Sequence, residues 1–188
     1  MLIELFQIIV QACTTVLVAA CLLRFYLHFL KINIAPNSGN PLAQFLLPIT
    51  NWLVLPIKRV ISVGGRLDLA SLFASYLLVF IQTGLLIFFT GNSFDVAIAT
   101  TLALFDWLHL ILSGLIGIVL VHVLFTWTGT SSPTQEMFYE MTQPLLRPIR
   151  KISPSISGID FSALILVALI QIATVVLNHL QAILISAL

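Results

Sequence analysis

The sequence predicts an all-α membrane protein with four transmembrane helices, arranged as two parallel repeats that each carry a proline-broken amphipathic segment on the cytoplasmic side. Three observations lead to this prediction: the composition, four long apolar runs, and a repeated pattern of proline, basic and acidic residues. Of the 188 residues, 60% are hydrophobic and 8% are charged, and the mean hydropathy is +1.12. Soluble domains carry about a quarter charged residues. A chain with so few charges cannot cover a water-facing surface, so the bilayer is its expected solvent.

Four apolar runs have the length that a transmembrane helix needs, about 20 residues each. They cover residues 5–23, 69–89, 108–127 and 161–184. The third run is bracketed by Trp107 and Trp127, which a helix would place about 30 Å apart, the thickness of the hydrocarbon layer. Both tryptophans are therefore expected in the interfacial belts of the membrane.

The distribution of cations predicts the orientation of the chain. All eight Lys and Arg residues lie in, or at the ends of, the connection between the first two spans and the connection between the last two: Arg24, Lys31, Lys58, Arg59, Arg66, Arg147, Arg150 and Lys151. The connection between the second and third spans has none. Because cytoplasmic connections carry the excess of Lys and Arg, both long connections are expected in the cytoplasm and both termini outside.

An internal repeat appears when the chain is shifted against itself by 92 residues. The shift superimposes Pro41 on Pro133, Thr50 on Thr142, residues 56–59 on 148–151, Asp68 on Asp160 and Leu72 on Leu164. We therefore expect two repeats, 1–94 and 95–188, each with two transmembrane helices. Both repeats enter the membrane in the same sense, which makes them parallel. The alignment weakens upstream, where the first connection is about six residues longer, so that Arg24 falls opposite His122.

The segments 41–60 and 133–152 are too apolar for loops and contain prolines that are expected to interrupt a helix: Pro48, Pro56, Pro144 and Pro148. One interpretation is a short helix in the headgroup layer that buries its aromatic side chains there: Phe45, Trp52, Phe138 and Tyr139. The other is a re-entrant or docking element whose backbone groups face protein or a cavity. Pro56 and Pro148, just before the basic pairs, are predicted to have structural roles.

The basic residues of these segments are the predicted partner-binding or lipid-binding residues. They are Lys58, Arg59, Arg66, Arg147, Arg150 and Lys151. A cation near the membrane surface attracts anionic lipid by about 1 kcal/mol. The alternative is recognition of a specific headgroup or of an acidic segment on a partner. Arg24 lies near the end of the first span, and its long side chain is expected to reach the interface.

Asp68 and Asp160 precede the second and fourth spans. An aspartate at the start of a helix accepts free backbone amides and suits the helix dipole, which is worth about 1 kcal/mol. A carboxylate close to a basic pair could instead lock the cytoplasmic segment onto the helix by a charge-assisted hydrogen bond. The sequence leaves both roles open.

Patterns typical of catalysis are absent from the sequence, which has no H-E-x-x-H, no G-x-S-x-G, no phosphate loop and no cysteine cluster. No enzyme activity, no metal and no cofactor are therefore predicted. The net charge of +1 argues against a nucleic-acid partner. The expected partners are membrane lipids and either a membrane protein or a second copy of the chain. Histidines at similar depth, His109 with His179 and His28 with His122, leave haem binding as an alternative.

The doubled motif resembles the YggT family of small bacterial membrane proteins, whose relatives are often called YlmG. The resemblance is carried by Asn40-Pro41 and Ser132-Pro133, and by residues 143–151 (QPLLRPIRK) followed by 158–162 (GIDFS). It covers nearly the whole chain. The first repeat is less typical, since Trp52 stands where the second repeat has Pro144. Equal roles for the two repeats are therefore not expected.

The resemblance implies a multi-pass protein of the bacterial inner membrane and no catalytic residue. Family members are linked to osmotic shock and potassium supply, to division, nucleoid or plastid organisation and, for a chloroplast relative, to haem attachment on cytochrome b6. Such varied roles suit a scaffold or assembly factor that serves osmotic-stress tolerance or the organisation of the cell envelope and division. The alternatives are an ion or solute pathway related to potassium, and haem handling for a membrane cytochrome.

Overall fold

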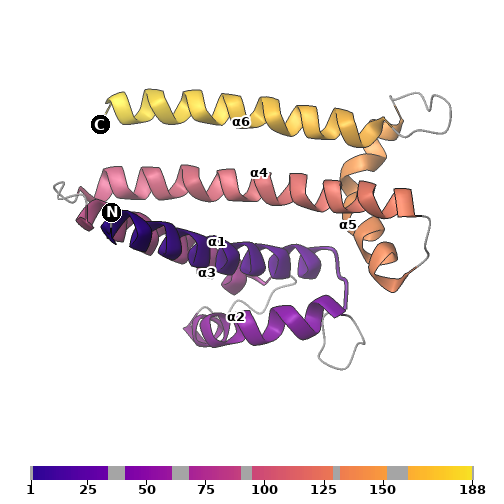
Figure 1. Ribbon diagram of the computed structural model, residues 1–188, viewed down its shortest axis with the longest axis horizontal. Helices are drawn as coiled ribbons and strands as arrows, with labels where there is room; N and C mark the ends of the chain where they lie inside the picture. Colours follow the sequence, from indigo (N-terminus) through magenta and orange to yellow (C-terminus); the bar gives the residue numbers. More distant parts are fainter. Residues whose placement is uncertain are drawn as a thin grey trace. The chain divides into compact units, whose positions relative to one another are not determined.

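The computed structural model describes residues 2–33, 41–60, 68–89, 95–128, 132–151 and 161–187, and within these ranges it contains six α-helices and no strands. The helices are α1 (Leu2–Phe29), α2 (Pro41–Val60), α3 (Leu69–Phe89), α4 (Val96–Thr128), α5 (Pro133–Arg150) and α6 (Ser162–Ala187) (Figure 1). Four of them, α1, α3, α4 and α6, are long and apolar enough to cross a membrane. The all-helical class and the four predicted spans are confirmed.

Helix α4 begins at Val96 and not at residue 108, where the apolar run begins. The carboxylate of Asp95 accepts a hydrogen bond from the amide of Ala97 at 2.8 Å, which caps the helix start. The hydroxyls of Thr100 and Thr101 donate to carbonyls of the same helix, so these polar residues are accommodated in its first turns. Trp107 therefore lies within α4 and not at its beginning.

The prediction that prolines break the segments 41–60 and 133–152 is wrong. Both α2 and α5 are continuous helices that contain two prolines each. A proline removes one backbone hydrogen bond and crowds the carbonyl four residues earlier, which bends a helix. All four internal prolines are exposed, so the crowded backbone lies on the outer side of each helix: Pro48, Pro56, Pro144 and Pro148. The start of α5 is also well capped, because the Ser132 hydroxyl accepts from the amide of Gln135 at 3.2 Å.

The chain forms two compact units, one from Met1–Ile111 and Leu180–Leu188 and the other from Leu112–His179. The division into repeats at residue 94 stays a prediction. In the first unit, α1 packs along α3, and α2 lies against both. Buried side chains from these three helices form one core cluster: Cys21, Val54, Ala70 and Ala74.

The first part of α4 also belongs to the first unit. The indole nitrogen of Trp107 donates to the hydroxyl of Ser75 on α3 at 2.8 Å, and the Trp107 ring meets Tyr76 edge-on at 5.9 Å between ring centroids. Small buried residues on α3, among them Ala74 and Ser75, let the neighbouring helices approach closely.

The second unit contains the remainder of α4, α5 and most of α6. In this unit α5 runs across the ends of α4 and α6 and not alongside them (Figure 1). Its core joins the three helices through Val119, Leu146, Ala163, Leu166 and Ile170. The exposed residues of α5 include the charged Glu136, Glu140 and Arg147.

Candidate functional site

A buried group of polar side chains, here called the ion cluster, joins α2 to α1 and to the start of α3. It consists of Arg24, Thr50, Asn51, Lys58, Asp68 and Ser71. Arg24, on α1, is 6% exposed, and Asp68, just before α3, is 4% exposed. The guanidinium Nε of Arg24 donates to Asp68 Oδ2 at 3.2 Å. Its Nη1 donates to Thr50 Oγ1 and to Asn51 Oδ1 on α2, both at 2.8 Å.

The other members of the ion cluster add further polar contacts. The Ser71 hydroxyl donates to Asp68 Oδ2 at 2.9 Å, and the Thr50 hydroxyl donates to the carbonyl of Leu46 at 2.7 Å. Lys58 Nζ lies 3.6 Å from Asp68 Oδ1, with 52% of the lysine side chain exposed. One guanidinium thus bonds to acceptors on two other segments of the chain. Such multiple bonding offsets the desolvation of a buried charge pair.

The electrostatics of Asp68 follow from these contacts. Burial acts to raise the pKa of the carboxyl. The hydrogen bond from Ser71 and the positive charges of Lys58, Arg24 and His28 outweigh it, so the pKa of Asp68 lies below its ordinary value. The carboxylate is therefore ionised at neutral pH, and its contact with Arg24 is an ion pair.

The contacts of Asp68 bear on the two roles that the sequence left open. Its carboxylate oxygen Oδ2 accepts from the side chains of Arg24 and Ser71, and the amide of Ser71 donates to the Asp68 backbone carbonyl at 3.0 Å. These contacts join the start of α3 to α1, and the ion pair with Lys58 at 3.6 Å joins it to α2. Which of the two roles Asp68 has stays a prediction. The side chain of Arg24 is buried among acceptors on other segments of the chain. Its expected position at the membrane interface stays a prediction.

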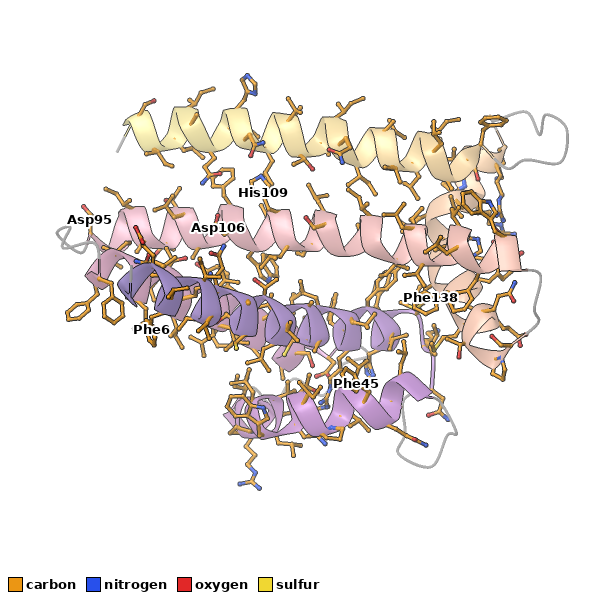
Figure 2. All side chains as sticks on the ribbon, viewed as in Figure 1. Phe6, Phe45, Asp95, Asp106, His109 and Phe138 are labelled. Carbon is orange, nitrogen blue, oxygen red and sulfur yellow. The ribbon has the colours of Figure 1, made fainter. Side chains whose placement is uncertain are left out.

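The outward side of α2 differs from the side that meets the ion cluster. Phe45 is 65% exposed and Trp52 is 60% exposed, and Leu55 and Arg59 are exposed on the same side. Their spacing places all four on one face of a helix with 3.6 residues per turn. Figure 2 shows side chains projecting from both sides of α2, with Phe45 labelled. α2 is therefore fastened on one face and presents aromatic, aliphatic and cationic groups on the other.

The remaining predicted site residues lie as follows. Arg59 is exposed near the end of α2, Arg147 and Lys151 are exposed at the end of α5, and Arg150 is half-buried there. Pro56 and Pro148 are exposed on the two helices. Arg66 and Asp160 lie outside the described residues, so the second aspartate of the repeat has no structural description.

The histidines suggested for haem are distributed over both compact units. The two members of each suggested pair belong to different units, so the pairing stays a prediction. Nδ1 of His109 lies 2.8 Å from the carbonyl of Phe105 on its own helix, and Nδ1 of His179 lies 3.0 Å from that of Val175. Within the described ranges, no three His, Cys, Asp or Glu side chains are grouped as a metal site would require.

Comparisons with known proteins agree with the motif-based resemblance. A family model described as CCB3/YggT matches residues 1–89 and 101–181. The chain is 35% identical over 136 residues to the YggT protein of Escherichia coli (strain K12), covering 71% of this chain and 70% of that protein. It is 28% identical over 179 residues to a Pseudomonas aeruginosa protein, covering 93% of this chain and 89% of that protein.

A Vibrio alginolyticus protein is 29% identical over 145 residues, covering 75% of this chain and 78% of its own. The names of these three relatives assign no activity to them. No solved structure matches the chain. The family match extends over both halves of the chain and includes the ion cluster and the segments that carry the basic pairs. The chain therefore belongs to the CCB3/YggT family.

Proposed function

We propose that this protein is a non-enzymatic scaffold or assembly factor of the bacterial inner membrane. In this proposal α2 is the docking platform for a membrane-protein partner at the cytoplasmic surface. The observation that carries the proposal is the contrast between the two faces of α2. Buried Arg24 fastens one face, while Phe45, Trp52, Leu55 and Arg59 are exposed on the other. Aromatic residues and arginine are the side chains that most often dominate protein interfaces.

The ion cluster suits a positioning role better than a purely stabilising one. Apolar side chains of the same size often stabilise a protein as well as a buried ion pair does, so burial of charge alone is weak evidence for stability. The hydrogen bonds from Arg24 to Thr50, Asn51 and Asp68 are directional, so they fix the orientation of α2 more precisely than apolar packing would. It specifies the rotation and register of α2 against α1 and α3, and hence which residues face outward.

The proposed cytoplasmic position of α2 and α5 rests on the distribution of Lys and Arg and on the repeat. Core positions support the repeat: Leu53, Val54 and Ile57 contribute to the core of the first unit. The residues 92 positions later, Leu145, Leu146 and Ile149, contribute to the core of the second. The family model also matches two stretches of similar length. We place both helices on the cytoplasmic side because each ends in a basic pair.

The two halves have unequal roles in this proposal. The outer face of α2 is largely apolar, whereas that of α5 carries Glu136, Glu140 and Arg147. Position 122, which falls opposite Arg24, is a histidine, so the second half has no equivalent guanidinium there. We therefore assign partner docking to the first half. The cellular roles we propose are osmotic-stress tolerance or the organisation of the envelope and division, as the family resemblance implies.

Site-specific photo-crosslinking in cells tests the docking platform. A photoreactive residue at Phe45 or Trp52 is expected to give a discrete adduct with one membrane protein. The same residue at Leu169, which is exposed on α6, serves as the control for random encounters in the membrane. Arg59→Glu is expected to reduce the adduct several-fold, whereas Lys151→Glu, the charge reversal at the matching position of the repeat, is expected to leave it unchanged. Adducts no more abundant at 45 and 52 than at 169 would contradict the proposal.

A further inference from the structure

A cavity of about 640 Å³ opens between α4, α5 and α6 within the unit Leu112–His179. Its walls are mainly aliphatic, with Leu120 on α4 and Leu164 and Val167 on α6. Arg150, at the end of α5, and His122, near the end of α4, also line it. The volume falls within the range of about 300 to 1,000 Å³ that is typical of sites for small molecules.

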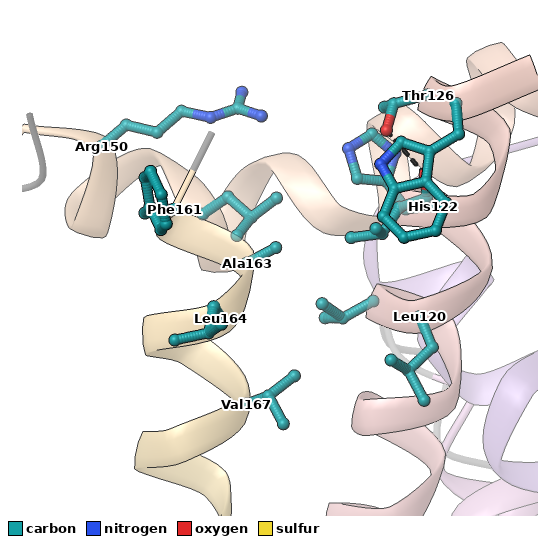
Figure 3. Close-up of a pocket in the computed structure, with 12 residues that line it drawn as sticks. Leu120, His122, Thr126, Arg150, Phe161, Ala163, Leu164 and Val167 are labelled. Atoms are coloured by element: carbon teal, nitrogen blue, oxygen red, sulfur yellow. Dashed lines mark hydrogen bonds between the residues drawn. The ribbon is translucent and has the colours of Figure 1, made fainter. Parts of the chain in front are cut away.

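The polar and apolar parts of the cavity are separated. Figure 3 shows Arg150 and His122 at the same end of the cavity, with the Arg150 side chain extending toward the α4 side. Leu120, Leu164 and Val167 lie further along the two helices, away from that end. Because α4 and α6 are both candidate spans, the aliphatic part lies between two helices that would be in the hydrocarbon layer.

We propose that this cavity binds one anionic phospholipid. The phosphate would lie at Arg150 and His122, and one acyl chain would lie between α4 and α6 against Leu120, Leu164 and Val167. A guanidinium binds phosphate oxygens through paired hydrogen bonds. Basic pockets between transmembrane helices on the cytoplasmic side are suited to anionic headgroups. This site is separate from the docking face of α2 and does not depend on the proposed scaffold function.

His122 lines two cavities, and their other lining residues decide which of the two suits an anion. The second cavity is lined by His122 as well, but its other lining residues include Glu136, Ser132 and Tyr139. A carboxylate repels an anion, whereas the guanidinium of Arg150 attracts it. Of the two cavities, only the first combines a cation, Arg150, with an aliphatic cleft.

Native mass spectrometry of the purified full-length protein in a neutral detergent tests the proposal. Three probes are titrated: phosphatidylglycerol, phosphatidylcholine with the same acyl chains, and inorganic phosphate. We expect one phosphatidylglycerol per chain, bound about tenfold more tightly than phosphatidylcholine, and no retained phosphate. A ten-fold preference corresponds to about 1.4 kcal/mol. Equal binding of the two lipids, or retention of phosphate without lipid, would overturn the assignment.

Two variants test the two ends of the site, each with a matched control. Arg150→Gln is expected to weaken phosphatidylglycerol binding about tenfold, since it removes a charged hydrogen-bond donor. Glu140→Gln, which removes a charge from an exposed position of the same helix, is expected to have no effect. Val167→Trp fills the aliphatic cleft and is expected to abolish binding, whereas Leu169→Trp, on an exposed position of α6, is not. Wild-type affinity in Arg150→Gln would contradict the proposal even if Val167→Trp failed to fold.

Discussion

Replacing Arg24 by methionine is expected to destabilise the protein by about 3 to 5 kcal/mol, the cost of removing one partner from a buried ion pair. The substitution leaves the carboxylate of Asp68 buried with, among the described residues, contacts to the Ser71 hydroxyl and the partly exposed Lys58. It also removes the donor that Thr50 and Asn51 share. Unfolding by denaturing detergent in mixed micelles measures the change in free energy. Arg59→Met, which removes an exposed cation from α2, is the control and is expected to change it by less than about 0.5 kcal/mol.

The double variant Arg24→Met, Asp68→Asn distinguishes a coupled ion pair from two independent contributions. If the two charges stabilise each other, the double variant is expected to lose less free energy than the sum of the two single variants, with a coupling of about 1 to 3 kcal/mol. Strictly additive losses would show that the 3.2 Å contact between Arg24 and Asp68 contributes nothing of its own.

Thr50→Val is expected to cost about 1 to 2 kcal/mol, because it removes one of the two acceptors that the buried guanidinium of Arg24 uses on α2. The same substitution at Thr142, the matching position of the repeat, is the internal control. The Thr142 hydroxyl is also fully buried, but its hydrogen bonds go to the carbonyls of Phe138 and Tyr139 on its own helix. Thr142→Val is therefore expected to cost less than about 0.5 kcal/mol. Equal losses at the two positions would contradict the assigned role of Thr50.

The number and approximate position of the four spans could be predicted because they depend on local composition. At the start of α4, Thr100, Thr101 and Asp106 lower the apolar content of a stretch that is nevertheless helical. Hydropathy does not detect this helix start, because the start depends on the Asp95 cap and on threonine hydroxyls that donate to carbonyls of their own helix. The prolines of α2 and α5 were expected to break the helices, but a helix can contain a proline when the carbonyl that it crowds lies on the outer side.

The site was only partly predictable. The sequence indicated the position of Asp68 at the start of a span and its possible lock with the basic pair of α2. It did not identify Arg24 as the centre of the ion cluster, because its acceptors lie 26, 27 and 44 residues away in the sequence. One signal was present: an ionisable residue close to a membrane span normally has a functional partner, and Asp68 is the acidic residue at the adjoining helix start. The repeat gave no indication of the pairing between Arg24 and Asp68, because the second half has His122 and not an arginine at the matching position.

The sidedness of the two basic pairs is the central claim of this account, and labelling with a membrane-impermeant maleimide tests it most directly. One cysteine is added at a time, by Arg59→Cys on α2 or by Lys151→Cys at the end of α5, both exposed positions. The unaltered chain, which contains Cys13 and Cys21, gives the background. We predict that neither new cysteine reacts in intact spheroplasts and that both react in inside-out vesicles. Reaction of the two positions from opposite sides of the membrane would contradict the account.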